Sequence, residues 1–149
     1  MARTYSTSFY PGPAFKKYLE ECAPLSKSPK QSKSALIDRA IDRYRAIVAA
    51  SLPPWSIEDW TQALQILQTM DLWPSSAIDV LGLVLQQGLE QRRAAGQTDA
   101  TNFAYRAKTL PVPARVAVAE VVERYFKRYA TITSEQLSAL LAEMGAQGF

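Results

Sequence analysis

An amphipathic helix over residues 32–50 is the feature that most constrains how this chain can fold. Ser32 and Ser34 suit its start, because a serine hydroxyl accepts a hydrogen bond from a first-turn N–H that has no partner inside the helix. The opposite face carries charge, from Asp38 to Arg45. An ordinary surface helix on an all-α core would explain this segment taken alone. Its apolar face recurs at helical spacing and consists of Leu36, Ile37, Ala40, Ile41, Tyr44, Ile47 and Val48.

The residues before this helix narrow the choice of fold. Residues 4–10 favour a β-strand, and Pro11 and Pro13 then end it. A short helical pattern follows, with apolar residues at i, i+3, i+4 and i+7: Phe15, Tyr18, Leu19 and Cys22. A strand, a short helix, a turn and a longer helix are therefore expected within the first fifty or so residues.

This order of elements, together with the pattern Ser-x-Ser-x-Leu-Ile-x-x-Ala-Ile-x-x-Tyr over residues 32–44, resembles the ribbon-helix-helix DNA-binding proteins of the Arc/MetJ/CopG type. The resemblance covers about the first third of the chain. It implies an intertwined homodimer, in which the strand pairs with the partner's strand and the second helices pack across the two-fold axis. A lone strand could not satisfy its own backbone. The implied dimer contacts are Tyr5, Phe9, Leu36, Ile37, Ile41 and Tyr44.

Alternation along the strand leaves two choices for the face that reads DNA. Thr4, Ser6 and Ser8 share the more polar face, and their hydroxyls can bond base edges in a major groove that admits a two-stranded ribbon. Alignment on Pro11 would instead present the face with Tyr5, Thr7 and Phe9. We expect the hydroxyl face to contact DNA.

The segment over residues 23–31 departs from the tight Gly-containing turn of these proteins, because it is longer and contains Pro24 and Pro29. Its lysines lie beside a helix start, where backbone N–H groups favour a phosphate. A solvated connector explains the same lysines. The residues expected at DNA are Arg3, Thr4, Ser6, Ser8, Lys27, Lys30, Ser32, Lys33 and Ser34.

Composition excludes several functional classes. The chain has no histidine and one cysteine, which removes the common general base, the usual metal ligands and any intramolecular disulfide. We therefore expect no enzyme, metal or cofactor. The net charge is only +3, yet the first 43 residues hold eight basic side chains against four acidic ones, which suits a phosphate backbone. With neither a membrane-length apolar run nor a secretory signal, a cytoplasmic location is expected.

After a break at residues 51–54, helical patterns fill the rest of the chain. Ser56 is expected to cap the start of a helix, Trp73 precedes one that ends before Gly96, and a short helix covers residues 103–108. Two more begin near Pro111 and at Thr133, where residues 133–136 form a capping box for a final helix that ends before Gly145. The segment 78–89 is apolar on most sides, which predicts either a central helix or an oligomer contact. Two other segments, residues 52–60 and residues 110–126, are similar to a group of bacterial proteins that join a ribbon-helix-helix segment to a helical tail.

The acidic residues and tryptophans after residue 54 have a simpler structural explanation than a catalytic or ligand-binding site. Glu58, Asp59, Glu120 and Glu123 are expected to be solvated carboxylates on polar helix faces. Trp55, Trp60 and Trp73 fit either an aromatic ligand site or, more simply, the core.

The sequence thus predicts a mainly α protein with a module at residues 1–51 and a domain of four to five helices at residues 52–149. The module holds one short strand, paired across a dimer, and two helices. The resemblance implies a dimeric repressor that binds double-stranded DNA, with the C-terminal helices serving oligomerisation or a protein partner. The alternative is an all-α adaptor that keeps the module only for dimerisation.

Overall fold

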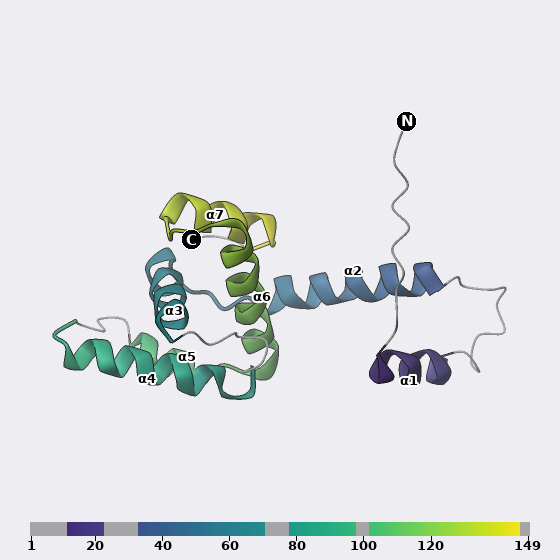
Figure 1. Ribbon diagram of the computed structural model, residues 1–149, viewed down its shortest axis with the longest axis horizontal. Coiled ribbons are helices and arrows are strands. Elements are labelled where there is room, and N and C mark those ends of the chain that lie inside the picture. Colours follow the sequence, from purple (N-terminus) through teal and green to yellow (C-terminus); the bar gives the residue numbers. More distant parts are fainter. Residues whose placement is uncertain (1–11, 23–32, 71–77, 98–101, 147–149) are drawn as a thin grey trace. The chain divides into compact units, whose positions relative to one another are not determined.

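The computed structural model describes residues 12–22, 33–70, 78–97 and 102–146, and within these ranges the chain is helical (Figure 1). The mainly α prediction is therefore confirmed. The strand expected at residues 4–10 lies outside the described residues. The elements in chain order are α1 (Pro13–Cys22), α2 (Lys33–Ser51), α3 (Ile57–Thr69), the 3₁₀ turn η3 (Ile78–Val80), α4 (Leu81–Ala94), α5 (Phe103–Lys108), α6 (Val112–Arg128) and α7 (Ser134–Glu143).

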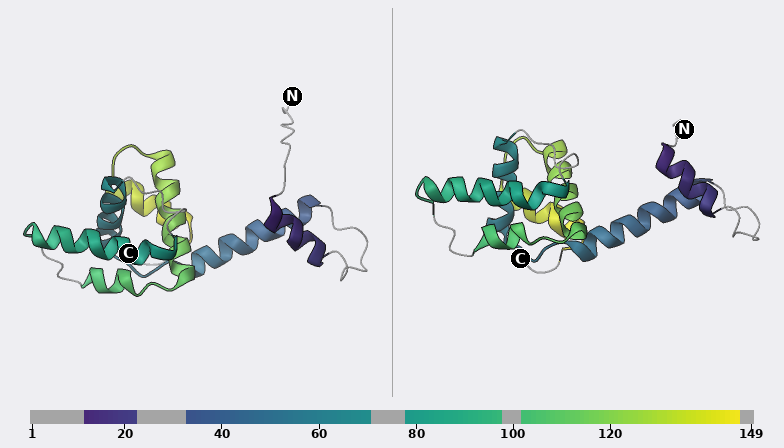
Figure 2. Two further views of the ribbon diagram at one scale, coloured as in Figure 1. Left: turned by 60° about the horizontal axis from the view of Figure 1, so that its bottom comes forward. Right: turned by 90° about the horizontal axis from the view of Figure 1, so that it is seen from below.

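The chain divides into two compact units, residues 1–39 and residues 40–149. The division falls inside α2, whereas the module boundary expected from sequence, between residues 51 and 52, coincides with the end of that helix. That assignment of modules stays a prediction. In the second unit α5 packs along α4, α3 contacts α4 and α7, and α6 contacts α7 and η3 (Figures 1 and 2).

One continuous core holds the second unit together. Its largest side chains are fully enclosed, and α2 also contributes Val48, which is 4% exposed. Trp55 packs edge-on against Trp60 and Phe103, with ring centroids 4.8 Å apart in each pair. The core explanation of these two tryptophans is therefore confirmed, while Trp73 lies outside the described residues. The enclosed large side chains are Trp60, Leu64, Leu81, Leu85, Phe103, Val118, Val121, Val122, Tyr125, Leu137, Leu140 and Leu141.

The start of α3 confirms the predicted cap and corrects one expectation. The Ser56 hydroxyl accepts from the N–H of Asp59, and the Asp59 carboxylate accepts in turn from the N–H of Ser56. Asp59 is only 3% exposed, however, and Arg106 of α5 donates to the same carboxylate at 2.8 Å. The prediction that Asp59 is solvated was wrong, because its residue type suggested a polar face and the tertiary partner lies 47 positions away.

Helices α4 and α7 end as the glycine positions predict. Gly96 and Gly145 both have φ of +90°, a conformation in which a side chain would be strained. Gly96 donates to the carbonyl of Arg93 and Gln97 to that of Arg92, the pattern of a Schellman motif. The same pair of bonds follows α7, from Gly145 to Ala142 and from Ala146 to Leu141. These C-terminal caps fix where the chain leaves α4 and α7.

The predicted α7 cap is formed in part. The Thr133 hydroxyl accepts from the N–H of Gln136, but the N–H of Thr133 donates to the Tyr125 hydroxyl instead of to the Gln136 side chain. That hydroxyl also lies 2.9 Å from the carbonyl of Thr131 and 3.1 Å from Oε1 of Gln136. Tyr125 therefore joins the end of α6 to the start of α7.

The spacing of apolar residues in α6 predicts a buried face of Val116, Ala119, Val122, Tyr125, Phe126 and Tyr129. The structure buries Ala119, Val122 and Tyr125, leaves the other three half-buried, and also buries Val118 and Val121. In α4 the buried positions Leu81, Leu85 and Leu89 form one stripe, while Leu83 remains 54% exposed.

Candidate functional site

The structure describes only part of the site expected from sequence. Nine of the residues expected at DNA or at the dimer interface stand in the N-terminal segment or in the connector before α2 and lie outside the described residues: Arg3, Thr4, Tyr5, Ser6, Ser8, Phe9, Lys27, Lys30 and Ser32. Lys33 and Ser34 form the first turn of α2, at the helix start where a phosphate was expected. Leu36 and Ile37 are half-buried on the next turn. These predictions about DNA and dimer contacts stay predictions.

The middle of α2 exposes large apolar side chains. Ile41 is 44% exposed, Tyr44 is 42% exposed and Ile47 is 56% exposed. Successive members of this set are three residues apart, so they lie along one side of the helix. Single exposed apolar residues are common on protein surfaces, whereas three of them here share one helix face. We call Ile41, Tyr44 and Ile47 the α2 row.

Tyr44 also belongs to a polar network with α6. Its hydroxyl donates to Oε2 of Glu120 at 3.1 Å, and Nε of Arg124 donates to Oε1 of the same carboxylate at 2.7 Å. Partial burial, followed by the negative charge of Glu120, raises the pKa of Tyr44 from 10 to about 12. Glu120 of α6 thus accepts hydrogen bonds both from Tyr44 of α2 and from Arg124 of α6.

The neighbouring carboxylates differ in how they are paired. Arg128 holds Glu143 of α7 through two hydrogen bonds of 2.6 and 2.9 Å, and this pairing lowers the pKa of Glu143 and raises that of Arg128. Glu123 is half-buried, and its Oε1 has no hydrogen-bond partner within the described part of the chain. Sequence reasoning had placed Glu120 and Glu123 on a solvated face. The i,i+4 spacing of Glu120 and Arg124 was visible in the sequence, but the contact with Tyr44, 76 positions away, was not.

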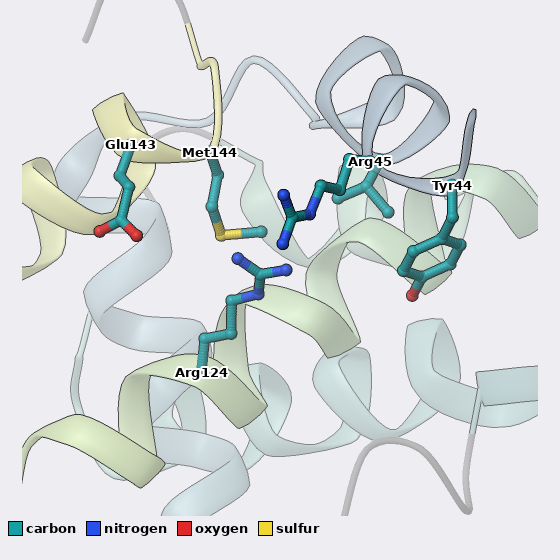
Figure 3. Close-up of a pocket in the computed structure, with 6 residues that line it drawn as sticks. Tyr44, Arg45, Arg124, Glu143 and Met144 are labelled. Atoms are coloured by element: carbon teal, nitrogen blue, oxygen red, sulfur yellow. The ribbon is translucent and has the colours of Figure 1, made fainter. Parts of the chain in front are cut away.

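A cavity of about 270 Å³ lies between α2, α6 and the end of α7 (Figure 3). Figure 3 shows the guanidinium ends of Arg45 and Arg124 pointing toward each other beside the thioether of Met144. The Glu143 carboxylate lies on the other side of Met144 from Arg45. Tyr44 and Val48 complete the lining. The cavity thus gathers two cationic groups next to an apolar side chain.

Searches of protein-family models, curated proteins and solved structures found no match to this chain. The function therefore has to be argued from the residues and their geometry.

Within the described ranges, no helix combines the length and the apolar character that a membrane span requires. The same residues contain no group of three or more Cys, Asp or Glu side chains arranged to hold a metal ion.

Proposed function

We propose that this protein is a sequence-specific DNA-binding protein that acts as a homodimer, in the manner of a cytoplasmic transcriptional repressor that controls its own gene. The observation that carries the proposal is the order of elements in the N-terminal third. A β-favouring segment over residues 4–10 precedes the short helix α1, and the longer helix α2 begins at Lys33 within the Ser-x-Ser pattern. This is the order that a ribbon-helix-helix protein requires.

The exposure of α2 supports the dimer. A row of three large apolar side chains loses water contact only if another surface covers it, and burying apolar surface drives association. In the proposed dimer the covering surface is α2 of a second copy, related by a two-fold axis. Tyr5, Phe9, Leu36 and Ile37 extend this contact in the proposal.

DNA contact is proposed for two groups of residues. Thr4, Ser6 and Ser8 would read base edges from the ribbon, and Lys33, Ser32 and Ser34 would hold a phosphate at the start of α2. The excess of basic side chains in the first 43 residues supplies the non-specific attraction to the backbone.

The test is a fluorescence-anisotropy titration of the full chain with the DNA upstream of its own gene and with a scrambled duplex, at two salt concentrations. We expect tighter binding to the upstream duplex and a steep loss of affinity with salt, because phosphate contacts release counterions. Thr4→Ala/Ser6→Ala/Ser8→Ala should remove the preference for the upstream duplex. Thr7→Ala is the matched control, since it removes a hydroxyl from the opposite face of the same strand. Absence of binding to either duplex at low salt would reject the proposal.

The dimer has its own test by sedimentation velocity. Ile41→Glu places a charge on the α2 row and should shift the protein to monomer, whereas Arg43→Glu changes an exposed neighbour outside the row and should leave the dimer intact. A dimer that survives Ile41→Glu would contradict the proposed interface.

A second candidate function is an adaptor whose N-terminal module serves only to dimerise. The observation that favours it is the attachment of α2 to the helical unit, through burial of Val48 and the bond from Tyr44 to Glu120. These contacts would hold α2 as part of a binding surface instead of a DNA-reading module. A stable dimer with no salt-dependent affinity for DNA would favour the adaptor.

A further inference from the structure

The cavity between α2, α6 and α7 holds a pair of arginines whose charges face each other. Arg45 has no hydrogen-bond or ion-pair partner within the described residues, and its side chain is exposed. Arg124 uses Nε to bond Glu120, so its two terminal nitrogens remain for another acceptor. Figure 3 shows the two guanidinium ends directed at each other, and both residues line the cavity.

We propose that this cavity binds a phosphate group, held between Arg45 and Arg124. Guanidinium groups present planar forks of N–H donors that match phosphate oxygens, and two forks can share one dianion. A bound anion would also offset the repulsion between the two cations. The ligand chemistry is therefore a phosphate, supplied either by a small phosphate compound or by the backbone of DNA.

The arrangement of Arg124 resembles a built site more than a mobile surface charge. Its Nε is fixed at 2.7 Å from Glu120, and Glu120 is fixed in turn by the Tyr44 hydroxyl. A guanidinium held along one edge presents its other edge in a defined direction, so less side-chain freedom is lost when it binds an anion.

None of the acidic residues near the cavity takes the place of an anion between Arg45 and Arg124. Glu143 lines the cavity and lies near enough to Arg124 for that charge to help lower its pKa, but both of its carboxylate oxygens accept hydrogen bonds from Arg128. Glu120 neutralises one edge of Arg124. Glu123 lies close enough to Tyr44 to contribute to its raised pKa, and it does not line the cavity. The ends of the two arginines that face the cavity are left for an external anion.

The cavity has a size that suits this ligand. Its volume is about 270 Å³. A water molecule in the liquid has a share of about 30 Å³, so a phosphate group enters with room for a few waters or for the atom that esterifies it. Val48 and Met144, which are both buried, add apolar lining beside the two arginines.

Methionine-methyl NMR of the full chain gives a direct test, because Met144 lines the cavity and Met70 stands at the end of α3, outside it. Inorganic phosphate is titrated at constant ionic strength, with chloride as the replaced anion. We expect a saturable shift of the Met144 methyl signal while the Met70 signal stays in place. Arg45→Gln and Arg124→Gln should each weaken phosphate binding by about tenfold or more, the loss expected for a charge-assisted hydrogen bond.

Matched controls remove a positive charge from the same helices without touching the cavity. Arg43→Gln on α2 and Lys127→Gln on α6 should bind phosphate within about twofold of the parent protein, the spread expected from weak surface electrostatics. An unchanged Met70 signal reports that each variant is folded. Equal losses in controls and cavity variants would overturn the proposal, because they would indicate a general charge effect.

A second arm separates the two sources of phosphate and rests on the proposed DNA binding. A short duplex is titrated in place of phosphate. A shift of Met144 with duplex alone, lost in Arg45→Gln and Arg124→Gln, would assign the site to the DNA backbone. A shift with free phosphate in a protein that binds no DNA would support a small-molecule site and reject the repressor function separately. No shift with either probe would overturn the phosphate site.

Discussion

Helices α2 and α6 have similar lengths but different environments. They contain 19 and 17 residues, and both carry apolar side chains at helical spacing. Helix α6 buries Val118, Val121, Val122 and Tyr125, whereas Val48 is the one buried side chain among those described in α2. The periodicity of a sequence thus shows that a helix has an apolar face, and does not show whether the same chain covers it.

The difference also separates two kinds of stabilisation. The face of α6 contributes to folding through apolar surface buried within the second unit, about 25 cal/mol for each Å² removed from water. The α2 row is 42–56% exposed, so about half of its surface still contacts water in a single chain. A second copy could bury that surface, which would make the stability of α2 depend on protein concentration.

The largest expected effect compares truncations on the two kinds of face. Leu140→Ala removes a fully enclosed side chain from the core and should cost about 2–5 kcal/mol in the free energy of unfolding, measured by urea denaturation. Ile41→Ala, at a position that is 44% exposed, should cost less than about 1 kcal/mol in dilute protein. Its cost should rise with protein concentration as the proposed dimer forms. A large cost for Ile41→Ala at all concentrations would show that α2 is already covered within the chain.

A smaller loss is expected from Asp59, the buried acid of the second unit. Asp59→Asn keeps the shape of the side chain but removes the charge that accepts the Arg106 hydrogen bond at 2.8 Å. We expect a loss of about 1–3 kcal/mol in the free energy of unfolding. Glu58→Gln is the matched control, because Glu58 stands in the same first turn of α3 and is exposed. Equal effects of the two changes would show that the interior pairing contributes nothing beyond surface charge.

Gly88→Ala tests how closely α3 and α4 approach. A Cβ at residue 88 would lie 2.3 Å from Cγ2 of Ile66, a branched side chain that is 4% exposed. Overpacking of about 1–3 kcal/mol should outweigh the gain of about 1 kcal/mol in helix propensity, so the variant should be less stable. Adding Ile66→Ala should relieve part of this cost, and a double-mutant cycle would measure the coupling. Additive effects would contradict the close contact.

The local signals in the sequence predicted much of the second unit. Ser56 marked the start of α3, Gly96 the end of α4, and the short helix over residues 103–108 was placed as the structure has it. Each of these features depends on hydrogen bonds or conformations within a few residues, which a sequence pattern records.

The features that sequence reasoning missed depend on distant partners. Burial of Asp59 requires Arg106, and the half-buried position of Glu120 reflects its bond to Tyr44. In the sequence, Arg45 is one of several charges on a polar helix face. The fold is needed to show that Arg45 and Arg124 line the same cavity. The expected DNA-reading strand lies outside the described residues, so the residue-level prediction there stays a prediction.

The smallest expected effect concerns the bond that joins α2 to α6. Tyr44→Phe removes the hydroxyl that donates to Glu120, and at neutral pH a partly exposed bond of this kind should change stability by less than about 1 kcal/mol. The pH dependence is more informative. Because the pKa of Tyr44 rises from 10 in the unfolded chain to about 12 in the fold, the folded protein retains a proton between these values that the unfolded chain has lost.

The contribution of Tyr44 to stability should therefore be complete below pH 10 and decline as the pH rises toward 12. Absorbance of tyrosinate in the parent protein minus that in Tyr44→Phe isolates this one group among the seven tyrosines. A difference curve with its midpoint near pH 12 would confirm that Glu120 and partial burial hold the proton on Tyr44. A midpoint near 10 would mean that α2 is not held against α6 in solution, and the positioning of Arg124 for an anion would lose its support.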